Sequence, residues 1–183
     1  VRFWRKRYSK VFVETCPHYL THTSDMDLGG MGKANPPFRS ADEREALWEG
    51  LIDGTIDVVA SDHCPRKRAT KDKSLWLASQ GFPGTATILP VLLHEGYHQR
   101  GLSLQRIAQL VCHSPARIFG LEHRKGNIAP GLDADLSLVD LNLEKTVNHV
   151  DLLSYSDYSI YFSGWYVAHA GATGETHQGS DLT

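Results

Sequence analysis

Cysteine is scarce in this sequence, with three residues in 183, and they are odd in number and far apart: Cys16, Cys64 and Cys112. A disulfide framework needs paired cysteines, and zinc knots or redox pairs need a CxxC spacing that does not occur here. These classes of protein are excluded. We therefore expect a protein of a reducing compartment, the cytoplasm.

Net charge is also small, since 19 basic and 21 acidic residues leave a formal charge of -2. This balance produces no field that would favour nucleic acid or an anionic membrane. No apolar run approaches the ~20 residues that cross a bilayer, and no signal-peptide pattern opens the chain. We expect a globular protein that acts on a small molecule. Because the sequence begins with Val1, we also expect a further portion of the protein to precede it.

Three segments near the start of the sequence have the order strand, helix, strand. Residues 10–15 are β-branched and aromatic, which predicts a short strand. Ser40 and Glu43 have capping-box spacing, and apolar residues then recur at helical intervals up to a glycine, which predicts a helix over 40–53. Residues 56–61 are mostly apolar without alternation, as in a strand covered on both faces. This order indicates a βαβ unit with parallel strands.

Helical spacing continues in the middle of the sequence. It predicts a helix over 85–99 and a second one that Ser103 caps and that ends near residue 111. Ser114 and Pro115 are expected to restart a short helix.

The pattern changes from helical to β-type after Gly126, with a strand predicted over 134–140. We therefore expect two domains, 1–125 and 126–183. The end of the chain, from Ala168, turns small and polar, and we expect it to be disordered or truncated.

Asp62 is the main candidate for chemistry, because it directly follows the buried strand predicted over 56–61. Parallel α/β barrels place their reactive groups at the carboxyl ends of their strands. An aspartate there can ligate a divalent metal ion and accept a proton from an activated water. An ordinary loop or helix-capping aspartate is an equally good reading of the position alone.

Two further stretches have the composition of rigid ligand-binding loops. Asn35 precedes two prolines, which hold the backbone extended and remove hydrogen-bond donors. Gln80 and Gly81 open a stretch in which glycine and proline let the backbone approach a bound molecule closely. Each stretch taken alone is also compatible with a simple connecting loop.

Six stretches resemble, in order and spacing, the cyclic amidohydrolases, a family that includes dihydroorotases, hydantoinases or dihydropyrimidinases, and allantoinases. They cover roughly residues 10–145 and are ETCPHYL at 14–20, KANPPFR at 33–39, ASDHCP at 60–65, GFPG at 81–84, SPARIFGL at 114–121 and KGNIAPGLDADL at 125–136.

The resemblance implies an α/β fold: the C-terminal part of a (β/α)8 TIM barrel, with residues 10–15 as strand seven and 56–61 as strand eight. Residues from 126 onward would build part of a small β-domain. The family implies a homo-oligomer, or an N-terminal barrel portion that completes this chain.

The resemblance also implies a site for two divalent metal ions, commonly zinc. Their ligands in the family come from strands one, four, five, six and eight, and the strand-eight aspartate corresponds to Asp62. A metal-bridging hydroxide would attack a ring amide, and Asp62 would carry the proton to the leaving nitrogen. Asn35, Gln80 and Gly81 would contact the substrate ring. We expect the isolated chain to be inactive and the full-length protein to hydrolyse a cyclic amide or ureide.

The sequence does not decide which cyclic amide is the substrate, and it leaves one alternative function open. Arg66 stands where dihydroorotases have histidine and hydantoinases an aromatic residue, so the resemblance favours neither substrate. We expect His18 to be structural and His63 to orient loop groups. A non-catalytic relative that keeps the barrel as a scaffold or interaction subunit is the alternative function.

Overall fold

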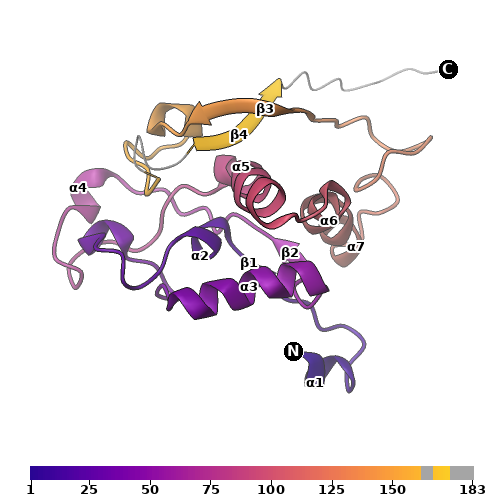
Figure 1. Ribbon diagram of the computed structural model, residues 1–183, viewed down its shortest axis with the longest axis horizontal. Helices are drawn as coiled ribbons and strands as arrows, with labels where there is room; N and C mark the ends of the chain where they lie inside the picture. The colour runs from indigo at the N-terminus through magenta and orange to yellow at the C-terminus, as the bar shows by residue number, and fades with distance from the viewer. Residues whose placement is uncertain (162–166, 174–183) are drawn as a thin grey trace.

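A short parallel sheet lies at the centre of the structure, a computed structural model that describes residues 1–161 and 167–173 (Figure 1). Strand β1 (Glu14–Thr15) pairs with strand β2 (Val58–Val59) in parallel, with Glu14 opposite Val58. A further bond, from the Ala60 N–H to the Thr15 carbonyl at 2.9 Å, continues the pairing towards the carboxyl ends. The predicted strands are therefore parallel neighbours, although both are shorter than expected.

Helix α3 (Ala41–Asp53) lies between the two strands in sequence, and the predicted boundaries hold to within one residue, with Ser40 as the N-cap. The Ser40 side chain accepts from the Glu43 N–H, and the Glu43 side chain accepts from the Ser40 N–H, so the capping box is present. The helix ends at Gly54, whose φ of +84° is readily adopted only by glycine. The expected βαβ unit is confirmed.

Both predicted helices in the middle of the chain are present, and each contains a π-helical stretch. Residues 85–98 form η2 (Thr85–Thr87), α5 (Ile88–Val91) and η3 (Leu92–His98). Residues 104–118 form α6 (Leu104–Ala108), η4 (Gln109–His113) and α7 (Ser114–Ile118), and the Ser103 side chain caps α6 as predicted.

The short helix predicted at Ser114 and Pro115 is present as α7, and it runs on from η4 without a break because Ser114 keeps helical dihedral angles. The wider π-helical turns of η4 lie where the proline removes a backbone donor and where its ring crowds the preceding turn.

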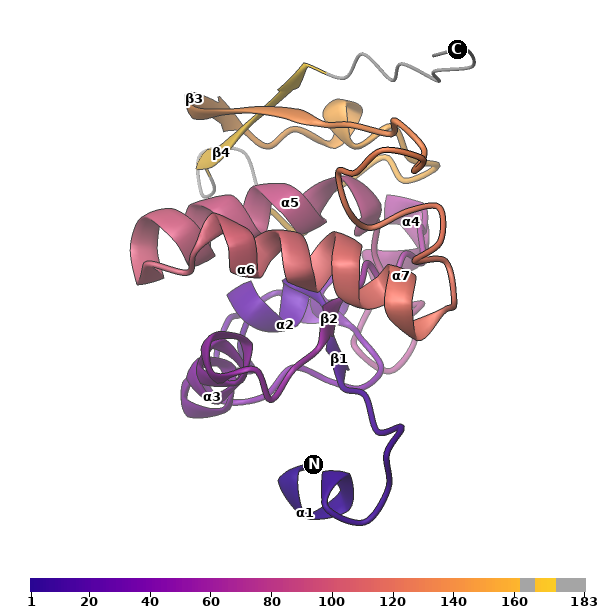
Figure 2. The same ribbon diagram turned by 90° about the vertical axis from the view of Figure 1, so that its right-hand side faces the viewer.

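The core lies between α3 on one side of the strands and the helices from α5 to α7 on the other (Figures 1 and 2). Trp48 and Leu51 of α3 belong to the same buried cluster as Leu92 of η3 and Leu110 of η4. Arg106 joins the layers, because its guanidinium donates to the backbone carbonyls of Leu51, at 2.8 Å, and Ile56, at 2.6 Å.

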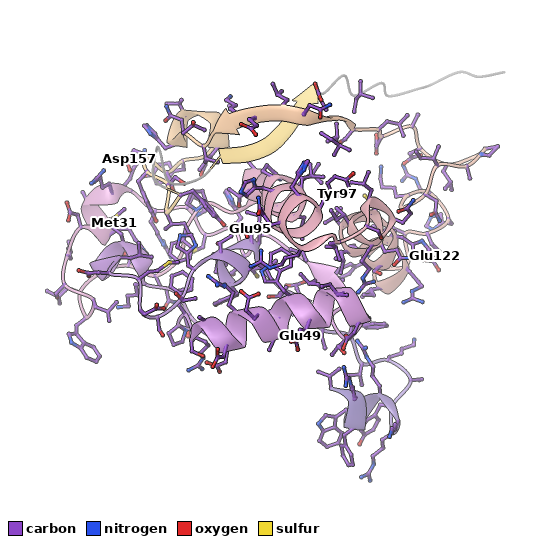
Figure 3. The ribbon with its side chains drawn as sticks, viewed as in Figure 1. Met31, Glu49, Glu95, Tyr97, Glu122 and Asp157 are labelled. Carbon is purple, nitrogen blue, oxygen red and sulfur yellow. The ribbon has the colours of Figure 1, made fainter. Side chains whose placement is uncertain are left out.

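Charged side chains follow the rim of this core. Arg100 lies over the Trp48 ring, 4.7 Å from its centroid, and pairs with Glu95 and Glu45. Glu95 lies between the helical layers, whereas Glu49 of α3 faces away from the strands (Figure 3).

A second sheet covers α5 and η3 on the side away from β1 and β2 (Figure 2). It pairs β3 (Leu138–Thr146) with β4 (Val167–Thr173) in an antiparallel arrangement. The strand predicted over 134–140 therefore starts later and runs further than expected.

The prediction of a disordered tail from Ala168 was wrong for residues 168–173, because they pair with β3 as part of β4. Residues 162–166 and 174–183 lie outside the described part of the chain.

Short helical turns complete the chain. They are α1 (Arg2–Arg5), α2 (Pro17–Thr21), η1 (Gly29–Gly32), α4 (Arg68–Lys71) and η5 (His149–Leu152).

Of the helices in the described part of the chain, none combines the length and the apolar character needed to cross a membrane.

Candidate metal-binding site at the carboxyl ends of the parallel strands

Asp62 lies just beyond the end of β2, in the position that the sequence predicts for it. Its backbone has a φ of +44°, in the left-handed region that aspartate tolerates better than most residues. The chain turns sharply at this point, and the carboxylate projects with 52% of its side chain exposed. A ligand arriving from solvent can therefore reach the carboxylate.

Two side chains from the end of β1 lie next to Asp62. Cys16 precedes α2 as its N-cap residue, and His18 lies in the first turn of that helix. The His18 Nε2 is 3.8 Å from Asp62 Oδ2, and the Cys16 sulfur, the His18 nitrogen and the Asp62 oxygen all lie within 4.8 Å of one another. Parallel pairing explains this cluster, because strands that run in the same direction end at the same edge of their sheet.

His18 is almost completely buried, with 3% of its side chain exposed, and its Nε2 has no hydrogen-bond partner. The ring packs against Tyr19 and Phe82, with centroids 4.2 and 5.2 Å away. Burial is the main cause that lowers the pKa of His18 to about 4, and the nearby His22 adds to the effect. At neutral pH the imidazole is therefore uncharged, and its polar Nε2 points at the carboxylate.

Cys16 is also buried. Burial, followed by the negative charges of Asp62 and Glu14, raises the pKa of its thiol to about 12. In the protein alone Cys16 therefore carries a proton at neutral pH, and its sulfur becomes a strong metal ligand only when a cation displaces that proton.

The GFPG stretch packs directly on the segment that carries Asp62. The Cys64 N–H donates to the Phe82 carbonyl at 2.9 Å, and His63 pairs with Phe82 in a parallel bridge. The His63 Nδ1 accepts from the Gly84 N–H at 3.2 Å, which is the loop-orienting role expected of it. The loop and the strand end therefore hold each other in place.

The stretches that carry Asn35, Gln80 and Gly81 are brought together. The Lys33 carbonyl accepts from the Gly81 N–H at 3.1 Å and from the Lys71 ammonium at 2.9 Å. Two residues further on, Asn35 is exposed.

The backbone of Gln80 and Gly81 already has partners within the protein. Tyr158 donates its hydroxyl to the Gly81 carbonyl at 3.0 Å, and Arg66 donates from Nε to the Gln80 carbonyl at 3.1 Å. Each carbonyl keeps a second lone pair that can accept a hydrogen bond, whereas the Gly81 N–H already donates to the Lys33 carbonyl. A role of these residues in substrate binding stays a prediction.

Sequence reasoning missed two features of this site. It assigned no role to Cys16 and treated His18 as structural, although both follow a strand predicted to run parallel to the strand before Asp62. Arg66 is exposed, its guanidinium donates to the Gln80 carbonyl, and its backbone N–H donates to the Ser156 hydroxyl at 2.9 Å.

Known proteins resemble the chain in sequence and in structure. Residues 17–164 match the Amidohydrolase family. A dihydroorotase of Halobacterium salinarum is 47% identical over 148 residues, 80% of this chain and 35% of that protein. An allantoinase of Solibacter usitatus is 47% identical over 135 residues, 72% of this chain and 29% of that protein.

Among solved structures, the L-hydantoinase (dihydropyrimidinase) of Arthrobacter aurescens superposes with a TM-score of 0.84 at 33% identity, covering 92% of this chain and 38% of that one. The chain spans about a third of the length of the curated relatives it matches.

Proposed function

We propose that this chain, which belongs to the amidohydrolase family, is part of an enzyme that hydrolyses a C–N bond in a cyclic amide or ureide. Relatives named dihydroorotase, allantoinase and L-hydantoinase support this substrate class. The observation that carries the proposal is the position of Asp62, an accessible carboxylate at the shared edge of two parallel strands.

The same reasoning extends to the architecture of the full-length protein. We propose that β1 and β2 are strands seven and eight of a (β/α)8 barrel, with residues 1–125 in the barrel and 126–183 in a small β-domain and tail. Active sites of such barrels lie at the carboxyl ends of the strands, which is the edge where Asp62 lies.

The Asp62 carboxylate fits a divalent metal ion. It is an oxygen donor of the kind that zinc accepts, and 52% of its side chain is exposed. In the proposed enzyme Asp62 would be a ligand of one of two ions, whose other ligands come from parts of the full-length protein outside this chain. When bound, the ions would polarise the amide carbonyl and activate a water molecule.

Asp62 itself would move the proton. A carboxylate held at the site can accept a proton from the attacking water and deliver it to the leaving ring nitrogen. Asn35 would donate or accept hydrogen bonds through its exposed amide, and the free lone pairs on the Gln80 and Gly81 carbonyls would accept from ring N–H groups. Together these contacts would orient the ring against the carboxylate.

The test is Asp62→Asn in the full-length protein. Asparagine has the same shape and also tolerates a left-handed backbone, so the fold should be retained. General acid–base groups contribute about 10²- to 10⁴-fold to rate, and we expect turnover to fall by at least that factor. Turnover would be measured on dihydroorotate, hydantoins, dihydropyrimidines and allantoin.

Asp140→Asn on β3 is the matched control, because the exposed Asp140 accepts from the Asn142 N–H through an oxygen that asparagine also has. We expect it to keep parental turnover. Undiminished activity of Asp62→Asn would remove Asp62 from the mechanism. No turnover of any of these substrates by the parental protein would favour the scaffold alternative.

A further inference from the structure

We propose that Cys16, His18 and Asp62 together form a binding site for one thiophilic divalent cation of the zinc and cadmium class. The site goes beyond the proposed hydrolysis, because the family resemblance assigns a metal to Asp62 but no metal ligand to Cys16 or His18. Binding of the cation does not depend on whether the protein is an enzyme.

The spacing of the three donors supports a single cation. Metal–ligand bonds of about 2.0 to 2.3 Å place two donors of one tetrahedral zinc ion about 3.3 to 3.8 Å apart. The His18 and Asp62 donors are 3.8 Å apart, and all three donor atoms lie within 4.8 Å of one another. The His18 and Asp62 donors already have this spacing, and a small rotation of the Cys16 side chain would bring its sulfur to the same spacing.

His18 provides an independent reason to expect a ligand. A buried polar nitrogen without a hydrogen bond is rare and costly, and His18 Nε2 is such an atom. It points towards Asp62 from a ring held on several sides by Tyr19, Phe38 and Phe82. A cation between His18 and Asp62 would accept the lone pair of the His18 Nε2 without any change in the packing of the His18 ring.

The combination of donors selects the type of cation. Thiolate and imidazole ligands favour zinc and cadmium, whereas magnesium and calcium prefer oxygen ligands alone. On binding, the Cys16 thiol releases its proton to solvent and the sulfur forms the metal bond. The exposed side of Asp62 leaves a fourth position open to water.

Occupancy of this site would compete with catalysis. A carboxylate bound to an additional cation loses basicity and cannot take a proton from water as readily. Excess thiophilic cation would therefore slow hydrolysis, a consequence that rests on the proposed function.

The experiment is a titration of the full-length protein with Cd²⁺, followed by the thiolate-to-cadmium charge-transfer absorption in the ultraviolet. We expect one equivalent to develop the band in the parental protein and no band in Cys16→Ser. Removing a group that merely orients a ligand costs about 10- to 100-fold in metal affinity. Loss of a ligand should cost at least as much, so we expect His18→Gln and Asp62→Asn to bind Cd²⁺ at least about 10-fold more weakly.

Cys64→Ser and Cys112→Ser are the matched controls, because they remove the other two free cysteines. We expect both to keep the band. A band that survives in Cys16→Ser, that is lost in Cys64→Ser, or that never forms in the parental protein would overturn the proposal. Circular dichroism would show that each variant is folded, and Cys16→Ala would replace Cys16→Ser if the serine variant does not fold.

A parallel assay separates this proposal from the proposed function. If the protein hydrolyses a cyclic amide, we expect Cd²⁺ to reduce the rate by a larger factor in the parental protein than in Cys16→Ser. A protein without hydrolytic activity would contradict the proposed function and leave the cadmium titration as the test of the site.

Discussion

Lys71 shows how a single buried residue links two loops of the site. Its ammonium group is fully buried, donates to the Lys33 carbonyl at 2.9 Å and lies 4.7 Å from the centre of the Phe82 ring. Burial is the main cause that lowers the pKa of Lys71 to about 8, and the positive charge of Lys33 adds to it.

This lowered pKa predicts a pH dependence of stability. Between about pH 8 and the ordinary lysine pKa of about 10.4, the unfolded chain binds more protons at this position than the folded chain. The free energy of unfolding therefore rises with pH across this window. Urea unfolding of the parental protein and of Lys71→Met at both ends of the window should show a smaller rise in the variant. Exposed Lys73→Met is the control, and equal rises in the parental protein and Lys71→Met would contradict the prediction.

Gly84 is required by close packing against the segment before Asp62. A Cβ added at Gly84 would lie 2.1 Å from the Ser61 carbonyl oxygen, so Gly84→Ala must push the loop away from the strand end. Because the His63 ring is anchored to this loop, we expect lower stability, measured by thermal unfolding, and lower turnover. Gly101→Ala is the comparison, since its φ is +68° but nothing lies within 4 Å of the added Cβ. A smaller loss in Gly84→Ala than in Gly101→Ala would refute this account.

At the scale of elements, local sequence predicted helices better than strands. Helix α3 was predicted to within one residue because its capping box and terminal glycine act within a few residues of each other. The strands predicted over 10–15 and 56–61 are each only two residues long in the structure, because strand length depends on a partner that lies far away in sequence. The π-helical stretches in two helices were not predicted, since no local residue pattern distinguishes them from α-helix.

The two capped helices provide a matched pair of substitutions. Ser40→Ala removes the two bonds of the hydroxyl, which accepts from the Glu43 N–H and donates to the Glu43 carboxylate, but keeps the bond from the backbone N–H. Ser103→Ala removes a single bond, from the Arg106 N–H to the hydroxyl. Replacing such a cap typically costs about 0.5 to 2 kcal/mol of stability. We expect the larger loss in Ser40→Ala, measured as free energy of unfolding in urea. An equal or smaller loss than in Ser103→Ala would show that the bond from the Ser40 hydroxyl to the Glu43 carboxylate contributes nothing.

At the scale of the whole molecule, the sheet that carries the site is small. In the described part of the chain, β1 and β2 form a sheet of two strands, and each strand has one unpaired edge. Parallel sheets are normally buried on both faces and paired on most edges. Since the chain spans about a third of its curated relatives, we propose that other parts of the full-length protein pair with these edges.

The chain expressed alone should therefore associate and should not catalyse. We expect light scattering to report a mass above that of one chain, because the unpaired strand edges attract other chains. We also expect no hydrolysis of cyclic amides by the isolated chain. A monodisperse monomer that turns over one of these substrates would contradict both expectations.

The sequence by itself determined the strand, helix, strand order of the first unit, the limits of α3 to within one residue, the parallel relation of the first two strands and the position of Asp62 at a strand end. These features depend on residue patterns that act over short distances or on motifs of fixed spacing. The role proposed for His18 depended on the tertiary structure. Only the fold brings the ends of β1 and β2 together and buries the His18 nitrogen beside the Asp62 carboxylate, 44 positions away in the sequence.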